Sequence, residues 1–224
     1  EIEWNGQWER IGRPHGLVAC FSFHPRKLLS TGDGGMLTTA DAALDRQFRL
    51  LRHHGMSVSD TVRHASATVI DEEYPVLGFN YRMTDIQAAI GREQLKRLPS
   101  IVARRRELAT RYHAGLDCCA GVQLTREPSW ARTNWQSYTI LVQRGRQRAI
   151  MQQLLDEGIS TRRGAMNAHA EGAYPPGTWR SAGPLACSED AQQRGIVLPL
   201  FHQLSESNQD RVIDRVRRVC GSQS

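Results

Sequence analysis

Lysine is nearly absent from this basic sequence: of 29 lysine and arginine residues, only Lys27 and Lys96 are lysines. Long apolar runs are also absent, and no stretch of about 18 apolar residues exists that could span a membrane. The five cysteines are odd in number and show no Cys-x-x-Cys spacing, so the sequence predicts neither a disulfide framework nor a zinc site. We therefore expect a cytoplasmic protein in a reducing environment, with no bound metal.

The net charge of +6 raises the question of a nucleic-acid partner. The arginines are scattered along predicted helices, as at 104–106 and 215–218, and neither interleaved aromatic residues nor a recognition motif accompanies them. This distribution favours solvated helix faces over a nucleic-acid surface. The N-terminal segment EIEWNGQWERIG is polar from its first residue, which predicts neither a signal nor a transit peptide. We expect a globular chain with no nucleic-acid and no membrane partner.

Two short apolar runs near the N-terminus have the character of strands. LVACFSF (17–23) and GMLTT (35–39) are separated by the glycine-rich stretch STGDGG, a pattern that predicts strand, loop and strand. Asp41 is placed to cap a helix that continues through Leu51, and Gly55 is expected to stop it.

The next part of the chain carries a long loop and then two helical patterns. Residues 56–79 show little periodicity and predict a loop of a length that is usually functional. Thr84 and Gln87 have the spacing of a capping box, and Pro99 is expected to break the helix that follows. The resulting pair of helices would form a hinge between two domains. The domains that we expect are residues 1–100 and 101–224.

The remainder alternates strand and helix patterns, which predicts the α/β class. The expected strands are 134–142, 159–163 and 196–200. Three helices are expected. The first spans 146–157, the second begins at Ser188, and the third is capped by Ser205. The last helix should bury one face, formed by Val212, Ile213, Val216, Val219 and Cys220.

Lys27 stands between an apolar run and a glycine turn in a chain that uses arginine at every other basic position except Lys96. Arginine keeps its proton, whereas a lysine amine can become neutral, attack a carbonyl and form a Schiff base. Ser22 can offer a hydroxyl to a phosphate, and the glycines of STGDGG permit close approach of the backbone to a ligand. The alternative is a surface lysine beside a hairpin loop. A P-loop and a GxGxxG fingerprint are both absent.

The stretch SFHPRKLLSTGDGGML resembles the lysine segment of the DegT/StrS-type sugar aminotransferases, approximately SFHxxKxxxxGEGG. LRHHGM resembles their LRxHG, and GFNYRMTDIQAAIGREQLKRL is similar to their GxNYRMxDIQAAIGxxQLxxL. ARRRELATRY, NWQSYTILV, the GIST strand and LPLFHQLSESNQDRVID follow in the family's order. The resemblance covers essentially the whole chain. It implies the C-terminal part of the large domain of a pyridoxal-phosphate (PLP) dependent transferase, plus a small C-terminal α/β domain.

The resemblance assigns roles to single residues. It implies that Lys27 forms the Schiff base with PLP and shuttles the proton during transamination. It implies that Ser22 binds the cofactor phosphate, and that Asn80 reaches that phosphate from the neighbouring subunit of a homodimer with shared active sites. Weaker candidates for contacts with a nucleotide-sugar substrate are Arg82, Arg162 and His169. Local hydrogen bonding is the expected role of His24, His53 and His54, because no metal-ligand spacing links them.

Two departures from the family pattern stand out. Asp33 occupies the position of the usual Glu, which is a conservative change. Family members also place a cofactor-binding half ahead of the lysine segment, including an aspartate that pairs with the ring nitrogen and would fall just before Glu1. A cofactor needs that nitrogen protonated to act as an electron sink. We therefore expect this chain alone to be an incompetent catalyst.

The interpretation is PLP-dependent transamination of a nucleotide-linked keto-sugar, with glutamate or glutamine as amino donor. A dehydratase branch of the family, in which histidine replaces the lysine, is disfavoured by Lys27. The alternative from another class is a non-catalytic remnant or partner subunit that lacks the first half. A nucleic-acid-binding module ranks third.

Overall fold

A computed structural model describes residues 1–13, 15–164 and 166–221. The contacts divide the chain into two compact units, Glu1–Leu98 and Pro99–Ser224. This division lies two residues before the boundary expected from the sequence. Helices and sheets are mixed in the way that the α/β prediction requires, although every pairing between the named strands is antiparallel. Among the described residues, no helix is long and apolar enough to cross a membrane.

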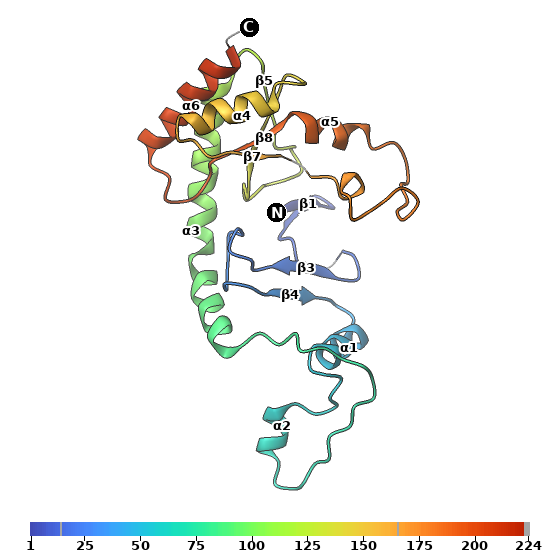
Figure 1. Cartoon of the computed structure of the whole chain (residues 1–224). Coiled ribbons are helices and arrows are strands. Elements are labelled where there is room, and N and C mark those ends of the chain that lie inside the picture. Colours follow the sequence, from blue (N-terminus) through green and yellow to red (C-terminus); the bar gives the residue numbers. More distant parts are fainter. Residues whose placement is uncertain (14, 165, 222–224) are drawn as a thin grey trace. The chain divides into compact units, whose positions relative to one another are not determined.

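The first unit is built from two antiparallel hairpins and three helical segments (Figure 1). The hairpins pair β1 with β2 and β3 with β4. The strands of the first unit are β1 (Ile2–Trp4), β2 (Gln7–Glu9), β3 (Ala19–Ser22) and β4 (Gly35–Thr38). Its helices are α1 (Ala42–Leu51), α2 (Asp60–Ala65) and the beginning of α3 (Asp85–Leu116).

The predicted start and stop of α1 are confirmed. The Asp41 carboxylate accepts hydrogen bonds from the backbone N–H groups of Ala43 at 2.7 Å and Leu44 at 3.2 Å. Gly55 adopts a φ of 75° and donates its N–H to the Leu50 carbonyl at 2.9 Å, which closes the C-terminal end. A short polar side chain and a glycine, both readable in the sequence, therefore delimit this helix.

Two short elements of the first unit differ from the predictions. The expected loop 56–79 contains the helix α2, whose N-cap Ser59 accepts from the N–H of Val62 at 3.3 Å. Six residues are too few to show the apolar repeat of a helix, so the sequence carries no periodic signal for α2. The hairpin β1–β2 turns through Asn5 and Gly6, both at positive φ, and was not predicted.

The predicted break at Pro99 is wrong. The helix α3 runs without interruption through Pro99 as far as Leu116. Proline removes a single backbone hydrogen bond from the helix and strains the preceding turn. The helix beyond it buries Leu108, Tyr112 and Leu116 in the core of the second unit, and this burial outweighs the local cost.

The second unit is a four-stranded antiparallel sheet with helices against one face (Figure 1). The strand order is β5-β6-β8-β7. Its strands are β5 (Val122–Leu124), β6 (Tyr138–Val142), β7 (Arg162–Arg163) and β8 (Gly195–Leu198). Its helices are α4 (Gln147–Asp156), the 3-10 turn η1 (Ala168–Ala170), α5 (Ala186–Arg194) and α6 (Glu206–Gly221).

The buried apolar core of the described residues lies in the second unit. Strand β6 alternates, with Tyr138, Ile140 and Val142 buried and the residues between them only half-buried. Helix α6 begins after Ser205, whose hydroxyl accepts from the N–H of Asn208 at 3.2 Å. The face predicted for this helix is buried as expected, with Val212, Ile213, Val216, Val219 and Cys220 in the core.

Element boundaries in the second unit differ in detail from the predictions. Strand β6 is shorter than the expected range 134–142, because Trp135 takes a positive φ and the chain reaches the sheet only at Tyr138. Strand β7 covers only the last two residues of the expected range 159–163. Helix α5 begins at Ala186, so Ser188 lies within its first turn and does not cap it. The short strand β5 was not predicted.

Candidate functional site

Lys27 lies on the connection between β3 and β4, in a turn where its backbone N–H donates to the His24 carbonyl at 2.9 Å. The connection is closed by a hydrogen bond from the Phe23 N–H to the Gly34 carbonyl at 2.8 Å. The Lys27 side chain is exposed. Among the described residues its amine has no hydrogen bond and no ion pair, whereas the amine of Lys96 pairs with Glu93 at 2.5 Å. One of the two lysines is therefore held on a closed loop with its amine available.

The conformation of the glycine-rich stretch after Lys27 is fixed by a close backbone contact and by local hydrogen bonds. A Cβ on Gly35 would lie 2.7 Å from the Phe21 carbonyl oxygen, so only glycine fits beside that strand. Thr31 is buried, and its hydroxyl donates to the Asp33 carbonyl at 2.7 Å. The Asp33 carboxylate accepts from the N–H of Gly34 at 2.9 Å. Aspartate, which has a shorter side chain than the usual glutamate, thus closes the turn through its own neighbour.

The start of α3 holds this loop in place. Thr84 and Gln87 form the predicted capping box, with the Thr84 N–H donating to Gln87 Oε1 at 3.0 Å and the Gln87 N–H donating to Thr84 Oγ1 at 3.3 Å. The Gln87 amide also donates to the Asp33 carbonyl at 3.0 Å. The sequence motif around Gln87 thus positions the loop that follows Lys27, a contact across 54 residues of sequence.

The two other motifs of the first unit, LRHHG and GFNYR, lie side by side. The His54 N–H donates to the Phe79 carbonyl at 2.9 Å, and the Tyr81 N–H donates to the Arg52 carbonyl at 3.0 Å. A Cβ on Gly78 would lie 2.0 Å from the Gly55 nitrogen, so the two backbones cross where neither can carry a side chain. Glycine at both positions is required by this crossing.

The pairing brings Asn80 and Arg82 beside two histidines. An Arg82 guanidinium nitrogen lies 2.8 Å from His53 Nδ1 and another lies 3.4 Å from His54 Nε2. Asn80 Oδ1 accepts from Arg82 Nε at 3.4 Å. Because arginine only donates, His53 Nδ1 accepts this hydrogen bond. His53 is buried, and its Nε2 finds no partner among the described residues.

The predicted site residues fall into both units. Lys27 and Ser22 share the β3–β4 hairpin, where the Ser22 hydroxyl accepts from the His24 N–H at 3.4 Å. Arg162 is exposed on β7, one of the two edge strands of the four-stranded sheet. His169 lies in η1 of the second unit, with Nε2 at 3.2 Å from the Glu189 carboxylate.

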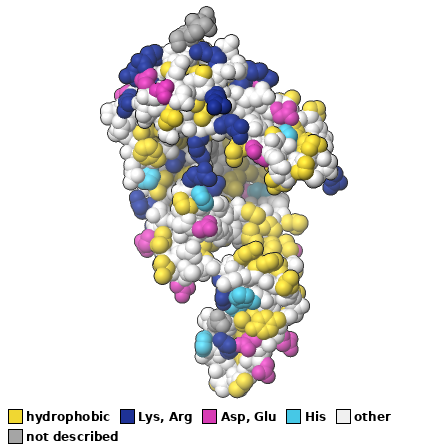
Figure 2. Space-filling model, in the orientation of Figure 1, with side chains coloured by type: hydrophobic (Ala, Val, Ile, Leu, Met, Phe, Trp, Pro, Cys, Tyr) yellow, Lys and Arg dark blue, Asp and Glu magenta, His cyan; other side chains and the backbone are white. Residues whose placement is uncertain are grey.

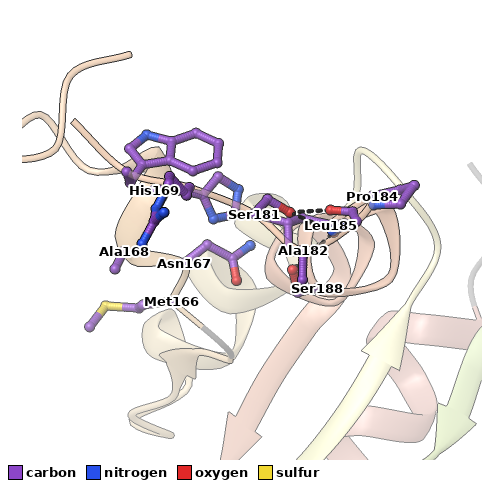
Figure 3. Close-up of a pocket in the computed structure, with 12 residues that line it drawn as sticks. Met166, Asn167, Ala168, His169, Ser181, Ala182, Pro184, Leu185 and Ser188 are labelled. Carbon is purple, nitrogen blue, oxygen red and sulfur yellow. Dashed lines mark hydrogen bonds between the residues drawn. The ribbon is translucent and has the colours of Figure 1, made fainter. Parts of the chain in front are cut away.

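His169 lines a pocket of about 560 Å³ in the second unit (Figure 3). Its ring lies 5.0 Å from the ring of Trp179. Asn167 lines the same pocket and was not singled out from the sequence. Its burial follows from the tertiary fold and has no signal in the sequence. His53 does form a hydrogen bond, but its partner Arg82 lies 29 residues further along the chain.

Among the residues that the structure describes, no group of three or more His, Cys, Asp or Glu side chains could hold a metal ion. The candidate groups of the first unit are the amine of Lys27, the hydroxyl of Ser22, the amide of Asn80 and the guanidinium group of Arg82. Such groups bind carbonyl and phosphate oxygens.

The model of the DegT/DnrJ/EryC1/StrS aminotransferase family matches residues 2–217. The aminotransferase TlmJ from Streptoalloteichus hindustanus is 32% identical and superposes with a TM-score of 0.79, over 91% of this chain and 52% of that one. A DegT DnrJ EryC1 StrS aminotransferase from Brucella abortus is 31% identical, with a TM-score of 0.77 over 92% of this chain and 52% of that one.

DesV from S. venezuelae, solved in complex with a ketimine intermediate, is 29% identical and has a TM-score of 0.82 over 100% of this chain and 56% of that one. The chain thus spans about half the length of these structures. Because the family model covers nearly every residue, from β1 to α6, the chain belongs to the DegT/DnrJ/EryC1/StrS aminotransferase family.

Proposed function

We propose that this chain carries the lysine-bearing part of a PLP-dependent sugar aminotransferase. The reaction moves an amino group from glutamate or glutamine to a nucleotide-linked keto-sugar. The observation that carries the proposal is the Lys27 amine, which is exposed and unpaired among the described residues on a loop closed by the Phe23–Gly34 hydrogen bond. Family membership and the names of the solved relatives support it.

The residues present fit PLP. When bound, PLP supplies an aldehyde for a lysine amine and an electron sink for the reacting carbon. Lys27 would hold it through the amine. Ser22, exposed at the end of β3, would bind the phosphate with its hydroxyl, whose proton is not used by the hydrogen bond from His24. Asn80 would add an amide donor from a second copy of the chain, in a homodimer.

Lys27 would also move the proton in the reaction. An amine that is released from its bond becomes a general base, and its Nζ would take a proton from one carbon and return it to the next. Arginine could not perform this step because it keeps its proton in proteins. This requirement accounts for the retention of a lysine at position 27.

Labelling of the 224-residue chain tests the proposal without a need for turnover. The chain is incubated with excess PLP, reduced with borohydride and digested, and the pyridoxyl label is located by mass spectrometry. We expect the label on Lys27 in preference to Lys96, because the Lys96 amine is paired with Glu93. The Lys27→Arg variant is the matched control and should lose the preferred label.

A label that favours Lys96, or that distributes equally between the two lysines, would contradict the assignment of Lys27. With only two lysines and one N-terminal amine in the chain, the three positions are resolved by a single peptide map.

A further inference from the structure

The side chains of His53, Asn80 and Arg82 lie on one face of the pairing between the two motifs LRHHG and GFNYR. His53 lies directly opposite Asn80 in an antiparallel bridge. Opposite residues of such a pairing direct their side chains to the same face, and the residue two positions further along the extended chain shares that face. Arg82 stands two residues beyond Asn80. The crossing of Gly55 and Gly78 keeps the two backbones in this close contact.

The guanidinium group of Arg82 contacts three side chains through its three nitrogen atoms. Its Nη1 lies 2.8 Å from His53 Nδ1, and its Nη2 lies 3.4 Å from His54 Nε2. Its Nε donates to Asn80 Oδ1 at 3.4 Å. Because a guanidinium group has donors and no acceptor, each of the three partner atoms accepts. We call these four residues the Arg82 cluster.

The contact with Arg82 determines which end of the Asn80 amide is presented to a ligand. An asparagine amide has an acceptor at its oxygen and two donors at its nitrogen, and rotation of the amide exchanges the two ends. The oxygen of Asn80 is occupied by Arg82, whereas its Nδ2 has no hydrogen-bond partner among the described residues. Asn80 is exposed, so a ligand can reach these donors. The positive charge of Arg82 beside them favours an anion.

His53 is the fixed member of the Arg82 cluster. It is only 8% exposed, whereas Asn80 and Arg82 are exposed. The hydrogen bond to Arg82 is the only one that the His53 ring forms among the described residues, because its Nε2 has no partner there. An exposed arginine has many rotamers, and an acceptor held by packing restricts them. The buried ring therefore orders Arg82.

We propose that His53 and Arg82 are positioning residues, which hold the Asn80 amide with its donors toward a phosphate group. His53 fixes Arg82, and Arg82 fixes the oxygen end of the Asn80 amide. This inference rests on the proposed function only in its assignment of the phosphate to PLP. The orientation of the amide requires neither PLP nor Lys27. Arg82 thereby has a different role from the substrate contact for which the sequence made it a candidate.

The order of the Asn80 amide is measured by NMR on the 224-residue chain labelled with ¹⁵N. In the unmodified chain, we expect its heteronuclear NOE to be close to that of the surrounding backbone. Arg82→Lys keeps the charge but has no planar fork for three acceptors, so the Asn80 amide should become mobile. Arg92→Lys, at an exposed position of α3, is the matched control and should leave the amide ordered. An amide that stays ordered in Arg82→Lys would overturn the proposal.

Two replacements of His53 separate an acceptor role from a packing role. Asparagine places its side-chain oxygen near the position of Nδ1, whereas glutamine is closer to histidine in volume but places its amide near the position of Nε2. An acceptor role predicts that His53→Asn keeps the Asn80 amide ordered and that His53→Gln releases it. The opposite order, or equal effects of the two variants, would assign His53 to packing and overturn its positioning role. Because Arg82 is exposed, Arg82→Lys tests the same contact without a change in the buried ring.

Cofactor labelling connects the amide to the phosphate of PLP. The concentration of PLP that half-saturates the pyridoxyl label on Lys27 is compared with that of pyridoxal, which lacks the phosphate. Arg82→Lys should reduce the preference for PLP about tenfold, the effect of one charge-assisted hydrogen bond, and should leave the value for pyridoxal unchanged. A preference that stays unchanged while the Asn80 amide has become mobile would overturn the phosphate as its ligand.

The two measurements distinguish this inference from the proposed function. A label that favours Lys96, together with an Asn80 amide that only the cluster variants release, would contradict the aminotransferase assignment alone. Preferred labelling of Lys27, together with an Asn80 amide that Arg82→Lys leaves ordered, would contradict the positioning roles of His53 and Arg82 alone.

Discussion

Arg105 and Arg106 of α3 donate to backbone carbonyls of a distant loop. Arg105 Nη1 donates to the Trp135 carbonyl at 2.8 Å, and Arg106 Nε donates to the Thr133 carbonyl at 3.0 Å. Arg105 is buried, and this burial lowers the pKa of its guanidinium from the ordinary value. The loop that leads into β6, in which Trp135 has a positive φ, is thus fixed by side chains of a helix.

Replacement of Arg105 by Met should destabilise the second unit by about 2–3 kcal/mol, because carbonyls that accept from a charged group lose their donor. The free energy of unfolding in urea measures this change. Arg148→Met, at an exposed position of α4, is the matched control and should stay within about 0.5 kcal/mol of the original chain. Equal effects of the two variants would show that the Arg105 contacts contribute little.

We expect a loss of stability at alkaline pH, because one thiol and two tyrosine hydroxyls that ionise there are buried. Burial raises the pKa of the Cys220 thiol to about 12 and raises the pKa of the Tyr112 and Tyr138 hydroxyls above the ordinary value. In the unfolded chain these groups have ordinary pKa values, about 8.5 for cysteine and about 10 for tyrosine. Because the folded pKa is the higher one, the stabilisation is complete below about pH 8 and is lost as the pH rises toward 12.

The urea midpoint, measured between pH 7 and pH 11 in the presence of a reductant, should therefore fall with increasing pH. Cys220→Ala should lower the stability at pH 7 through the cavity it leaves, and should flatten the alkaline slope. An unchanged slope in this variant would show that the thiol does not contribute.

At the scale of elements, Pro99 provides a test of helix continuity. In the structure α3 passes through Pro99, which is exposed and leaves the carbonyl of Leu95 without its usual helical donor. Pro99→Ala should restore that hydrogen bond and stabilise the helix locally by about 1–3 kcal/mol. Amide hydrogen exchange of residues 95–103 should slow accordingly, with Ser100→Ala as the neighbouring control. No slowing would indicate that the helix is interrupted in solution.

Local chemistry explains which elements could be predicted from the sequence. Asp41, Thr84 with Gln87, and Ser205 each cap a helix through a contact within three residues, so a short window of sequence is sufficient. The continuity at Pro99 could not be predicted, because it depends on burial far along the helix. The short strand β5 was missed because three residues show no reliable period.

The same distinction applies to the candidate site. Lys27 and Ser22 could be selected because the chemistry of an amine and a hydroxyl is visible in the sequence. The donation from Gln87 to the loop after Lys27, the partnership of His53 with Arg82, and the buried amide of Asn167 all join residues that are distant in sequence or depend on packing. No spacing in the chain indicates them, and only the fold places them.

At the scale of the whole molecule, the two units differ in how much apolar surface they bury. Every buried apolar side chain among the described residues belongs to the second unit. The first unit buries Thr31 and His53 but exposes large apolar side chains such as Leu77, Tyr81 and Ile86. Figure 2 shows hydrophobic side chains on the surface around the region of α1 and α2. Without a core of its own, the first unit has little to offset its conformational entropy.

We therefore expect the units to behave differently in isolation. Residues 99–224 should fold alone with cooperative unfolding, whereas residues 1–98 should aggregate or exchange their amides rapidly. Hydrogen exchange on the 224-residue chain should show slow amides in β6, β8 and α6 and fast amides in β3 and β4. Slow exchange of β3 and β4 in the isolated segment 1–98 would refute this prediction.

The crossing of Gly55 and Gly78 has a consequence for how this family member can diverge. The chain leaves the crossing at residue 56 and returns to it at residue 77, so the intervening segment is a loop with pinned ends. A doubling of the length of such a loop costs only about 0.6 kcal/mol in closure entropy. Insertions between residues 66 and 72 should therefore leave Asn80 and Arg82 in place. The crossing thus separates the length of this loop from the positions of Asn80 and Arg82.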